Sequence, residues 1–280
     1  MSDLTIGLVL PDVLGTYGDD GNALVLRQRA RMRGIDAEIH RILLGEPVPE
    51  GLDVYTVGGG EDVAQILAAE HLIADGGITR AVSAGRPVLA ICAGLQVFGR
   101  SFRASGRTVE GLGLIDATTS SLQKRMIGEL RSTPVAPETG GTGQGTDPEN
   151  TEPKNADLHE LTDTLTGFAN HQGATILGPD AAPLGRVIHG TGNTDAHGAL
   201  HAGLTPEQAK VEVYHEGAVQ GPVIATYMHG PVLARNPQLA DLLLARAVGC
   251  APSELPPMTG AFADQLSGEV ARLRSERLRA

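Results

Sequence analysis

Short apolar runs that alternate with segments of helical spacing constrain the fold of the first 100 residues most strongly. The apolar runs predict strands at 4–10, 36–43, 53–59 and 86–92, and the helical patterns lie at 22–34, 61–73 and 93–99. Such alternation is typical of a parallel sheet that helices cover on both faces. We therefore predict an α/β fold, whose ligands bind beyond the carboxyl ends of the strands.

The composition fits this class and excludes others. Aromatic residues make up 3% of the chain and Trp is absent, so the core is built from aliphatic side chains, as in buried parallel sheets. The formal net charge is -11 and only three lysines occur, which argues against nucleic acid as a partner. Two cysteines do not make a disulfide scaffold, and a reducing compartment fits them better.

The amino terminus and the hydropathy of the chain predict a cytoplasmic protein. Residues 1–12 carry neither a basic segment nor a small-residue cleavage site, so they do not read as a signal peptide. No apolar run reaches the ~18 residues that span a bilayer.

The second half is less regular. We expect one domain over 1–250 with probable loop insertions at 132–155 and 194–215, followed by a tail at 251–280 that is partly helical. A strand at 221–230 and an amphipathic helix at 236–249 are predicted near the end of the domain.

Cys92 lies where the strand 86–92 gives way directly to a helix. Ala90, Ala93 and Gly94 surround it, and small neighbours suit a tight strand-to-helix turn that lifts a nucleophile above a sheet. The amino terminus of the new helix favours the thiolate, and the Ala93 N–H is a candidate oxyanion donor. A buried core cysteine remains the alternative from this segment alone. Cys250 follows a helix that ends at Gly249, and we expect it to be structural.

Three glycines end the third predicted strand, in the sequence VGGGED at 57–62. Glycine lets backbone N–H groups approach a ligand closely, so this turn is a candidate for the other half of an oxyanion hole. A plain turn into a helix is the alternative. The pattern does not match the G-x-G-x-x-G dinucleotide fingerprint.

A thiolate nucleophile needs a general base, which is usually histidine. Among nine histidines, His229 is the best candidate because it ends a predicted strand at the same sheet edge, and His171 is the second. We place His40 in a strand and His71 in a helix. We place five others in or near loops, and no metal-binding spacing supports a zinc site: His159, His189, His197, His201 and His215.

Four motifs together resemble class I glutamine amidotransferases of the cobyric acid synthase (CobB/CobQ) type. They are VGGGED, PVLAICAGLQVFG, GFANHQG and ATYMHGPVLARNPQLAD, and the resemblance covers about residues 4–249. It implies a flavodoxin-like three-layer sandwich with a mostly parallel central sheet. Three stretches, 111–130, GFANHQG and 186–193, are similar more narrowly to glutaminase subunits of lipid II isoglutaminyl synthases.

The resemblance implies the chemistry of each site residue. Cys92 would attack the carboxamide of L-glutamine and form a thioester, and His229 would move the proton from the thiol to the leaving ammonia. The backbone at Gly59, Gly60 or Ala93 would bind the oxyanion. Arg125 would bind the α-carboxylate of glutamine, for which a guanidinium fork is well suited.

The resemblance also implies a partner. The chain lacks the G-x-x-x-x-G-K-[ST] motif and is expected to need no cofactor of its own. A Mur-ligase-like subunit of the MurT type would use ATP and magnesium, and ammonia from this chain would amidate the D-glutamate of lipid II to D-isoglutamine in peptidoglycan biosynthesis. The complex would bring the protein to the inner face of the membrane as a peripheral component.

One departure from related enzymes concerns the acid that orients the base. Many class I amidotransferases have His-Pro-Glu, whereas this chain has His229-Gly230-Pro231 followed by Val232. We therefore expect the partner to supply an acid. The alternatives for function are a glutaminase for another synthetase, such as one that amidates a corrin, a thiol hydrolase or peptidase on the same fold, and a catalytically silent binding module.

Overall fold

A computed structural model describes residues 3–135 and 156–279 of the chain. Its central sheet has the strand order β11-β12-β4-β3-β1-β2, and every neighbouring pair except β11–β12 is parallel. The predicted α/β class is therefore confirmed. The strands are β1 (Leu4–Val9), β2 (Ala37–Ile42), β3 (Val54–Val57), β4 (Val88–Ile91), β11 (Ala218–Gln220) and β12 (Val223–Thr226).

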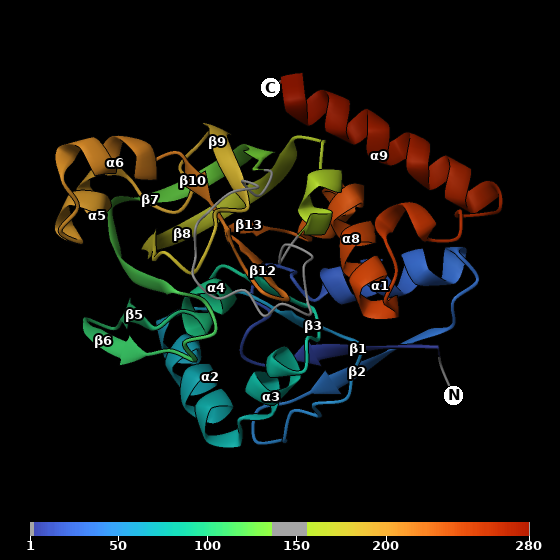
Figure 1. Cartoon of the computed structure of the whole chain (residues 1–280), viewed down its shortest axis with the longest axis horizontal. Coiled ribbons are helices and arrows are strands. Elements are labelled where there is room, and N and C mark those ends of the chain that lie inside the picture. The colour runs from blue at the N-terminus through green and yellow to red at the C-terminus, as the bar shows by residue number, and fades with distance from the viewer. Residues whose placement is uncertain (1–2, 136–155, 280) are drawn as a thin grey trace, which may run out of the picture.

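Helices cover both faces of the central sheet, as Figure 1 shows. All residues of β3, β4 and β12 are buried, which requires a layer on each side. On one face lie α1 (Gly21–Met32), α7 (Val232–Arg235) and α8 (Pro237–Val248), and on the other α2 (Asp62–Asp75), α3 (Gly77–Ser83) and α4 (Ala93–Phe98). The helix α3 was not predicted.

A second sheet, which is mostly antiparallel, was not anticipated. Its longest strands, β7 (Ala117–Pro134) and β8 (Leu165–Leu177), pair along most of their length. Its other members are β5 (Ser101–Ala104), β6 (Arg107–Glu110), β9 (Gly185–His189), β10 (His215–Glu216) and β13 (Met228–His229).

The strand predicted at 221–230 is divided between the two sheets. Its first part, β12, pairs with β4 of the central sheet, whereas β13 pairs with β8 of the second sheet. Tyr227 lies between the two parts. The chain therefore changes sheets immediately before His229.

The predicted loop at 194–215 is wrong. This segment contains α5 (Ala196–His201) and α6 (Pro206–Glu212) and ends on β10. Thr205 begins α6 with a capping box, in which its hydroxyl accepts the N–H of Gln208 while the Gln208 side chain accepts the N–H of Thr205. In the first predicted insertion, residues 136–155 lie outside the described part of the chain.

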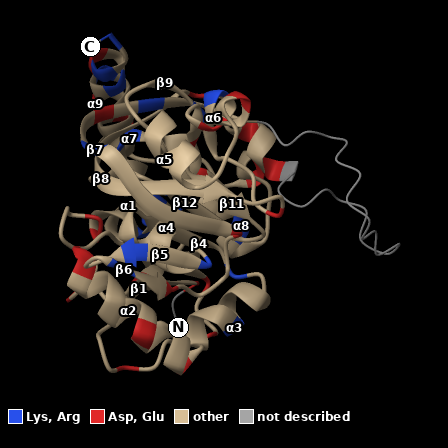
Figure 2. Ribbon diagram, turned by 90° about the vertical axis from the view of Figure 1, so that its left-hand side faces the viewer, with Lys and Arg blue, Asp and Glu red and all other residues tan. Residues whose placement is uncertain are grey.

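The tail contains the predicted helix, α9 (Ala261–Arg279), after a short 3-10 turn at η2 (Pro252–Glu254). Figure 2 shows the basic residues of α9 at one end of the molecule, and α9 contacts α7 and β8. The buried Arg274 donates to the carbonyl oxygens of Arg235 and Thr164, and this contact fixes α9 to the domain. Within the described residues, no helix is both long and apolar enough to cross a bilayer.

Candidate active site

Cys92 occupies a strained turn between β4 and α4. Its φ of 52° and ψ of -98° are rare for a residue with a side chain and place strain of about 1–3 kcal/mol at this position. A Cβ on Gly94 would lie 3.1 Å from the carbonyl oxygen of Val57, so the turn needs a small residue there. Cys92 is 5% exposed and belongs to the buried core, and it also lines a cavity. The strained strand-to-helix turn that the sequence predicted is therefore present.

His229 is held by an acid from this same chain. Its Nδ1 lies 2.9 Å from Oδ2 of Asp19, in the loop between β1 and α1. Burial acts to lower the pKa of His229, but the interactions with Asp19 and Cys92 outweigh it and raise the pKa to about 10. The imidazolium is thereby favoured beside the thiol.

Asp19 is 2% exposed and completes a Cys–His–Asp arrangement within this chain. The acid that we expect from a partner stays a prediction. The sequence signal was the pair Asp19–Asp20 directly before the helix α1. An acidic residue at that place usually caps a helix, so the pattern alone did not indicate a catalytic role.

The glycine turn after β3 contacts Asp19 as well as the substrate cavity. The N–H of Gly59 donates to Oδ2 of Asp19 at 2.9 Å, so Gly59 is removed from the predicted oxyanion donors. A Cβ on Gly59 would lie 2.6 Å from Cε1 of His229, 3.2 Å from Oδ2 of Asp19 and 3.4 Å from Cβ of Cys92. Gly59 therefore packs against all three residues of the Cys–His–Asp arrangement. Gly60 lines the cavity, and Ala93 is the first residue of α4.

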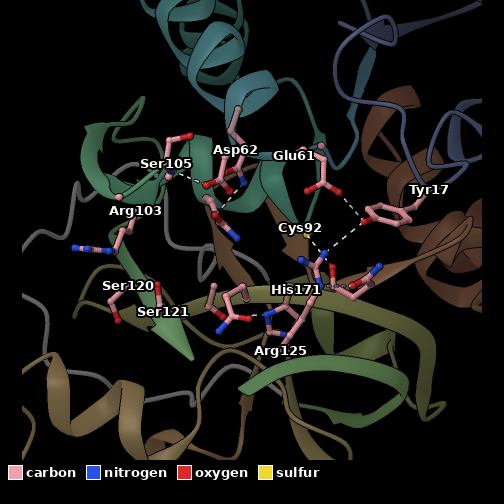
Figure 3. Close-up of a pocket in the computed structure, with 18 residues that line it drawn as sticks. Tyr17, Glu61, Asp62, Cys92, Arg103, Ser105, Ser120, Ser121, Arg125 and His171 are labelled. Carbon is pink, nitrogen blue, oxygen red and sulfur yellow. Dashed lines mark hydrogen bonds between the residues drawn. The ribbon is translucent and has the colours of Figure 1, made fainter. Parts of the chain in front are cut away.

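The cavity over Cys92 is small, at about 140 Å³, and polar. Figure 3 shows Arg125 and Glu61 on either side of the Cys92 position, and dashed lines join the hydroxyl of Tyr17, at the right, to both side chains. Arg125 reaches the site from β7, where its Nε donates to Oδ1 of Asn170 at 2.8 Å and its Nη2 to the Tyr17 hydroxyl at 3.5 Å. Arg125 therefore lines the cavity over Cys92, and its contact with substrate stays a prediction.

Two side chains at this cavity were missed by sequence reasoning. The Tyr17 hydroxyl donates to Oε1 of Glu61 at 2.9 Å, and the Tyr17 ring lies 4.7 Å from the ring of His229. Burial and the bond to Glu61 raise the pKa of Tyr17. Glu61 and Arg125 therefore place opposite charges at one cavity, which suits a zwitterionic ligand.

The back wall of the cavity is a buried hydrogen-bond network. Gln65 donates to Oε1 of Gln96 at 3.0 Å, and Gln96 donates to the hydroxyl of Tyr227 at 3.3 Å. The Tyr227 ring stacks on His171, with centroids 3.8 Å apart. These contacts fix Gln96, four residues after Cys92, on the first turn of α4.

His171, the second candidate for the base, has a different environment. Its Nδ1 lies 2.9 Å from the carbonyl oxygen of Gly173, and burial lowers its pKa to about 4. Because His229 alone of the two contacts an acid, the assignment of the base to His229 is favoured. The five histidines expected in loops lie on regular elements: His159 on η1 (Ala156–Glu160), His189 on β9, His197 and His201 on α5, and His215 on β10.

Comparison with known proteins decides the family. A family profile described as a CobB/CobQ-like glutamine amidotransferase domain matches residues 5–237. The chain belongs to this family. Among the relatives of this amidotransferase, subunit GatD of lipid II isoglutaminyl synthase (glutamine-hydrolyzing) from Streptococcus pneumoniae is 31% identical over 98% of this chain and 91% of that protein.

A second such subunit GatD, from Staphylococcus aureus, is also 31% identical, over 88% of the amidotransferase chain and 85% of that protein. The solved structure of PurLQS from Thermotoga maritima superposes with a TM-score of 0.50 at 10% identity, over 89% of this chain and 96% of that one. This likeness concerns the fold alone, and it agrees with the predicted amidotransferase architecture.

Proposed function

We propose that this chain is the glutaminase subunit of a lipid II isoglutaminyl synthase. The observation that carries the proposal is the strained Cys92 beside a His229 that Asp19 orients. The similarity to two GatD subunits over most of the chain supports the choice of complex.

In the proposed reaction the Cys92 thiolate attacks the carboxamide carbon of L-glutamine. The backbone N–H groups of Gly60 and Ala93 bind the developing oxyanion, and the His229 imidazolium protonates the departing nitrogen as ammonia. A γ-glutamyl thioester remains on Cys92. His229, now neutral, takes a proton from water, which attacks the thioester and releases glutamate.

We assign the two charges of the cavity to the two charges of the substrate. The Arg125 guanidinium binds the α-carboxylate, and the Glu61 carboxylate binds the α-ammonium. Tyr17, which contacts both side chains, holds them at a fixed separation. The assignment of Arg125 keeps the role that the family resemblance implied, and that of Glu61 is added here.

The ammonia is consumed by a partner in this proposal. A MurT-like ligase subunit uses ATP and magnesium to activate the D-glutamate of lipid II, and ammonia converts it to D-isoglutamine during peptidoglycan biosynthesis. This chain needs no cofactor of its own. The complex meets lipid II at the inner face of the membrane through the ligase.

The test is a glutamine-dependent amidation of lipid II by the chain together with its candidate ligase. Wild-type protein should release glutamate and form amidated lipid II, and Cys92→Ala should do neither with glutamine but still support amidation with added ammonium. Cys250→Ala is the matched control and should behave as wild type. Hydrolysis of glutamine with no transfer to lipid II would reject the proposed complex, and cleavage of peptides in place of glutamine would favour a thiol hydrolase.

A further inference from the structure

Glu216 is a fully buried carboxyl group outside the substrate cavity. It lies beside the break between β12 and β13, where the chain changes sheets. We propose that Glu216 is a positioning residue that sets the geometry of Cys92 and His229 through Thr226 and Tyr227. The proposal rests on the thiol chemistry assigned to Cys92 above.

The carboxylate holds the break between β12 and β13. Its Oε1 accepts the hydroxyl of Thr226 and, at 3.1 Å, the backbone N–H of Tyr227. The same Thr226 hydroxyl oxygen accepts the N–H of Met228 at 3.1 Å. Two consecutive N–H groups at this break are therefore satisfied by Glu216, directly or through one hydroxyl. A buried N–H without an acceptor would cost about 1–3 kcal/mol.

The held segment contacts both catalytic residues. The carbonyl oxygen of Thr226 accepts the N–H of Cys92 at 2.8 Å, which ties the elbow to the end of β12. His229 follows three residues later and pairs with Phe168 on β8. A shift of Thr226 relative to the second sheet would therefore change the separation of the thiol and the imidazole.

Glu216 itself is fixed in the second sheet. It ends β10 opposite Gly185, and the next residue, Gly217, exchanges two hydrogen bonds with the side chain of Asn193. A Cβ on Gly217 would lie 2.4 Å from the carbonyl oxygen of Ala225, so the chain directly after β10 passes very close to β12. This contact makes Glu216 a rigid link between the sheets.

The proposed role needs an oxygen at the Glu216 side chain that accepts hydrogen bonds, and it does not need a negative charge there. Burial raises the pKa of Glu216 to about 7, while the bonds from Thr226 and Tyr227 act to lower it. In either protonation state one oxygen can accept both bonds. Glutamine keeps such an oxygen, whereas methionine has a similar volume and lacks it.

The experiment compares Glu216→Met with Glu216→Gln in a Cys250→Ser background, where Cys92 is the remaining thiol. The rate of alkylation by iodoacetamide is measured at pH 7 and at pH 10. Because His229 must lie beside Cys92 to take up its proton, Glu216→Met should slow alkylation at pH 7 about tenfold or more. At pH 10 it should react at nearly the wild-type rate, and Glu216→Gln should resemble wild type at both.

Thr226→Val, with Thr226→Ser as its control, tests the same link if Glu216→Met does not fold. The Thr226→Val variant should lower kcat for glutamine with little change in KM, because Thr226 makes no contact with the substrate. A folded Glu216→Met or Thr226→Val protein with the wild-type alkylation profile would overturn the proposal. If wild type fails to hydrolyse glutamine while Glu216→Met still shows the selective loss at pH 7, the proposed function fails and the positioning role stands.

Discussion

The imidazole Nδ1 of His229 lies 2.9 Å from Oδ2 of Asp19, a residue 210 positions earlier in the chain. The same oxygen accepts the N–H of Gly59, so the carboxylate is held from two directions. With its Nδ1 proton directed at Asp19, the imidazole presents Nε2 for exchange with the thiol. This contact orients the imidazole from within the chain.

Replacement of Asp19 should change the pH dependence of turnover. In wild type the raised pKa of His229 keeps the imidazolium available until the pH approaches about 10, and kcat/KM should fall only above that range. Asp19→Asn removes the charge that favours the protonated ring. Its alkaline limb should therefore move to lower pH by about 1–3 units, with a lower kcat. Profiles of kcat/KM against pH measure this.

Asp20→Asn is the matched control for that experiment. Asp20 is adjacent in sequence, and its side chain makes no cap bond to the first turn of α1. Its profile should follow wild type. An unchanged alkaline limb in Asp19→Asn would remove Asp19 from the mechanism.

A methyl group at Gly59 should disable the site and leave the fold intact. It would lie 2.6 Å from Cε1 of His229, which forces the ring to move. A displacement of about 1 Å at a reacting group can cost about 100-fold in rate. Gly59→Ala should therefore lose most of its glutaminase activity with an unchanged circular dichroism spectrum. Gly51→Ala, where no atom lies within 4 Å of the new methyl, should be fully active.

Arg125→Met should raise KM for glutamine far more than it lowers kcat. A charged hydrogen bond contributes about 1.5–3 kcal/mol, which corresponds to about a 10- to 100-fold rise in KM. Steady-state kinetics with glutamine and with an analogue that lacks the α-carboxylate test the assignment, because the analogue should not distinguish the variant from wild type. Lys124→Met, one residue away and exposed, should leave both parameters unchanged. Equal losses on the two substrates would contradict the assigned contact.

Arg274→Met should destabilise the chain without changing the site. Arg274 is 9% exposed and donates to Arg235, Asn236 and Thr164, so each of these acceptors would lose one hydrogen bond. The loss should be about 2 kcal/mol in the free energy of unfolding, measured by urea denaturation. The control is Arg272→Met, whose exposed side chain pairs with Glu269 and Glu276 of α9. A similar midpoint for the two variants would show that α9 is not anchored through Arg274.

The parts of the site that sequence reasoning found were those with a local signature. A strand, a cysteine among small residues and a helix follow one another directly, so the position of Cys92 could be read from a single segment. The glycines after β3 and the histidine at the end of β13 also follow from their place at strand ends.

The parts that were missed depend on contacts between distant segments. Nothing near Asp19 indicates that its carboxylate meets His229 instead of capping α1. The second sheet was hidden because β7 is largely polar and pairs with β8 only after a long interval in the sequence. The N–H of Gly59 could not be assigned to Asp19 before the two loops were known to meet.

The change of sheets at Tyr227 divides the reaction centre between two separately hydrogen-bonded frameworks. The central sheet carries the Cys92 sulfur and the second sheet carries the His229 imidazole. The distance between these two groups therefore depends on how the two sheets pack against each other. A tilt of one framework against the other would therefore alter turnover. Because Arg125 lies on β7, the same tilt would also displace the side chain assigned to the α-carboxylate of glutamine.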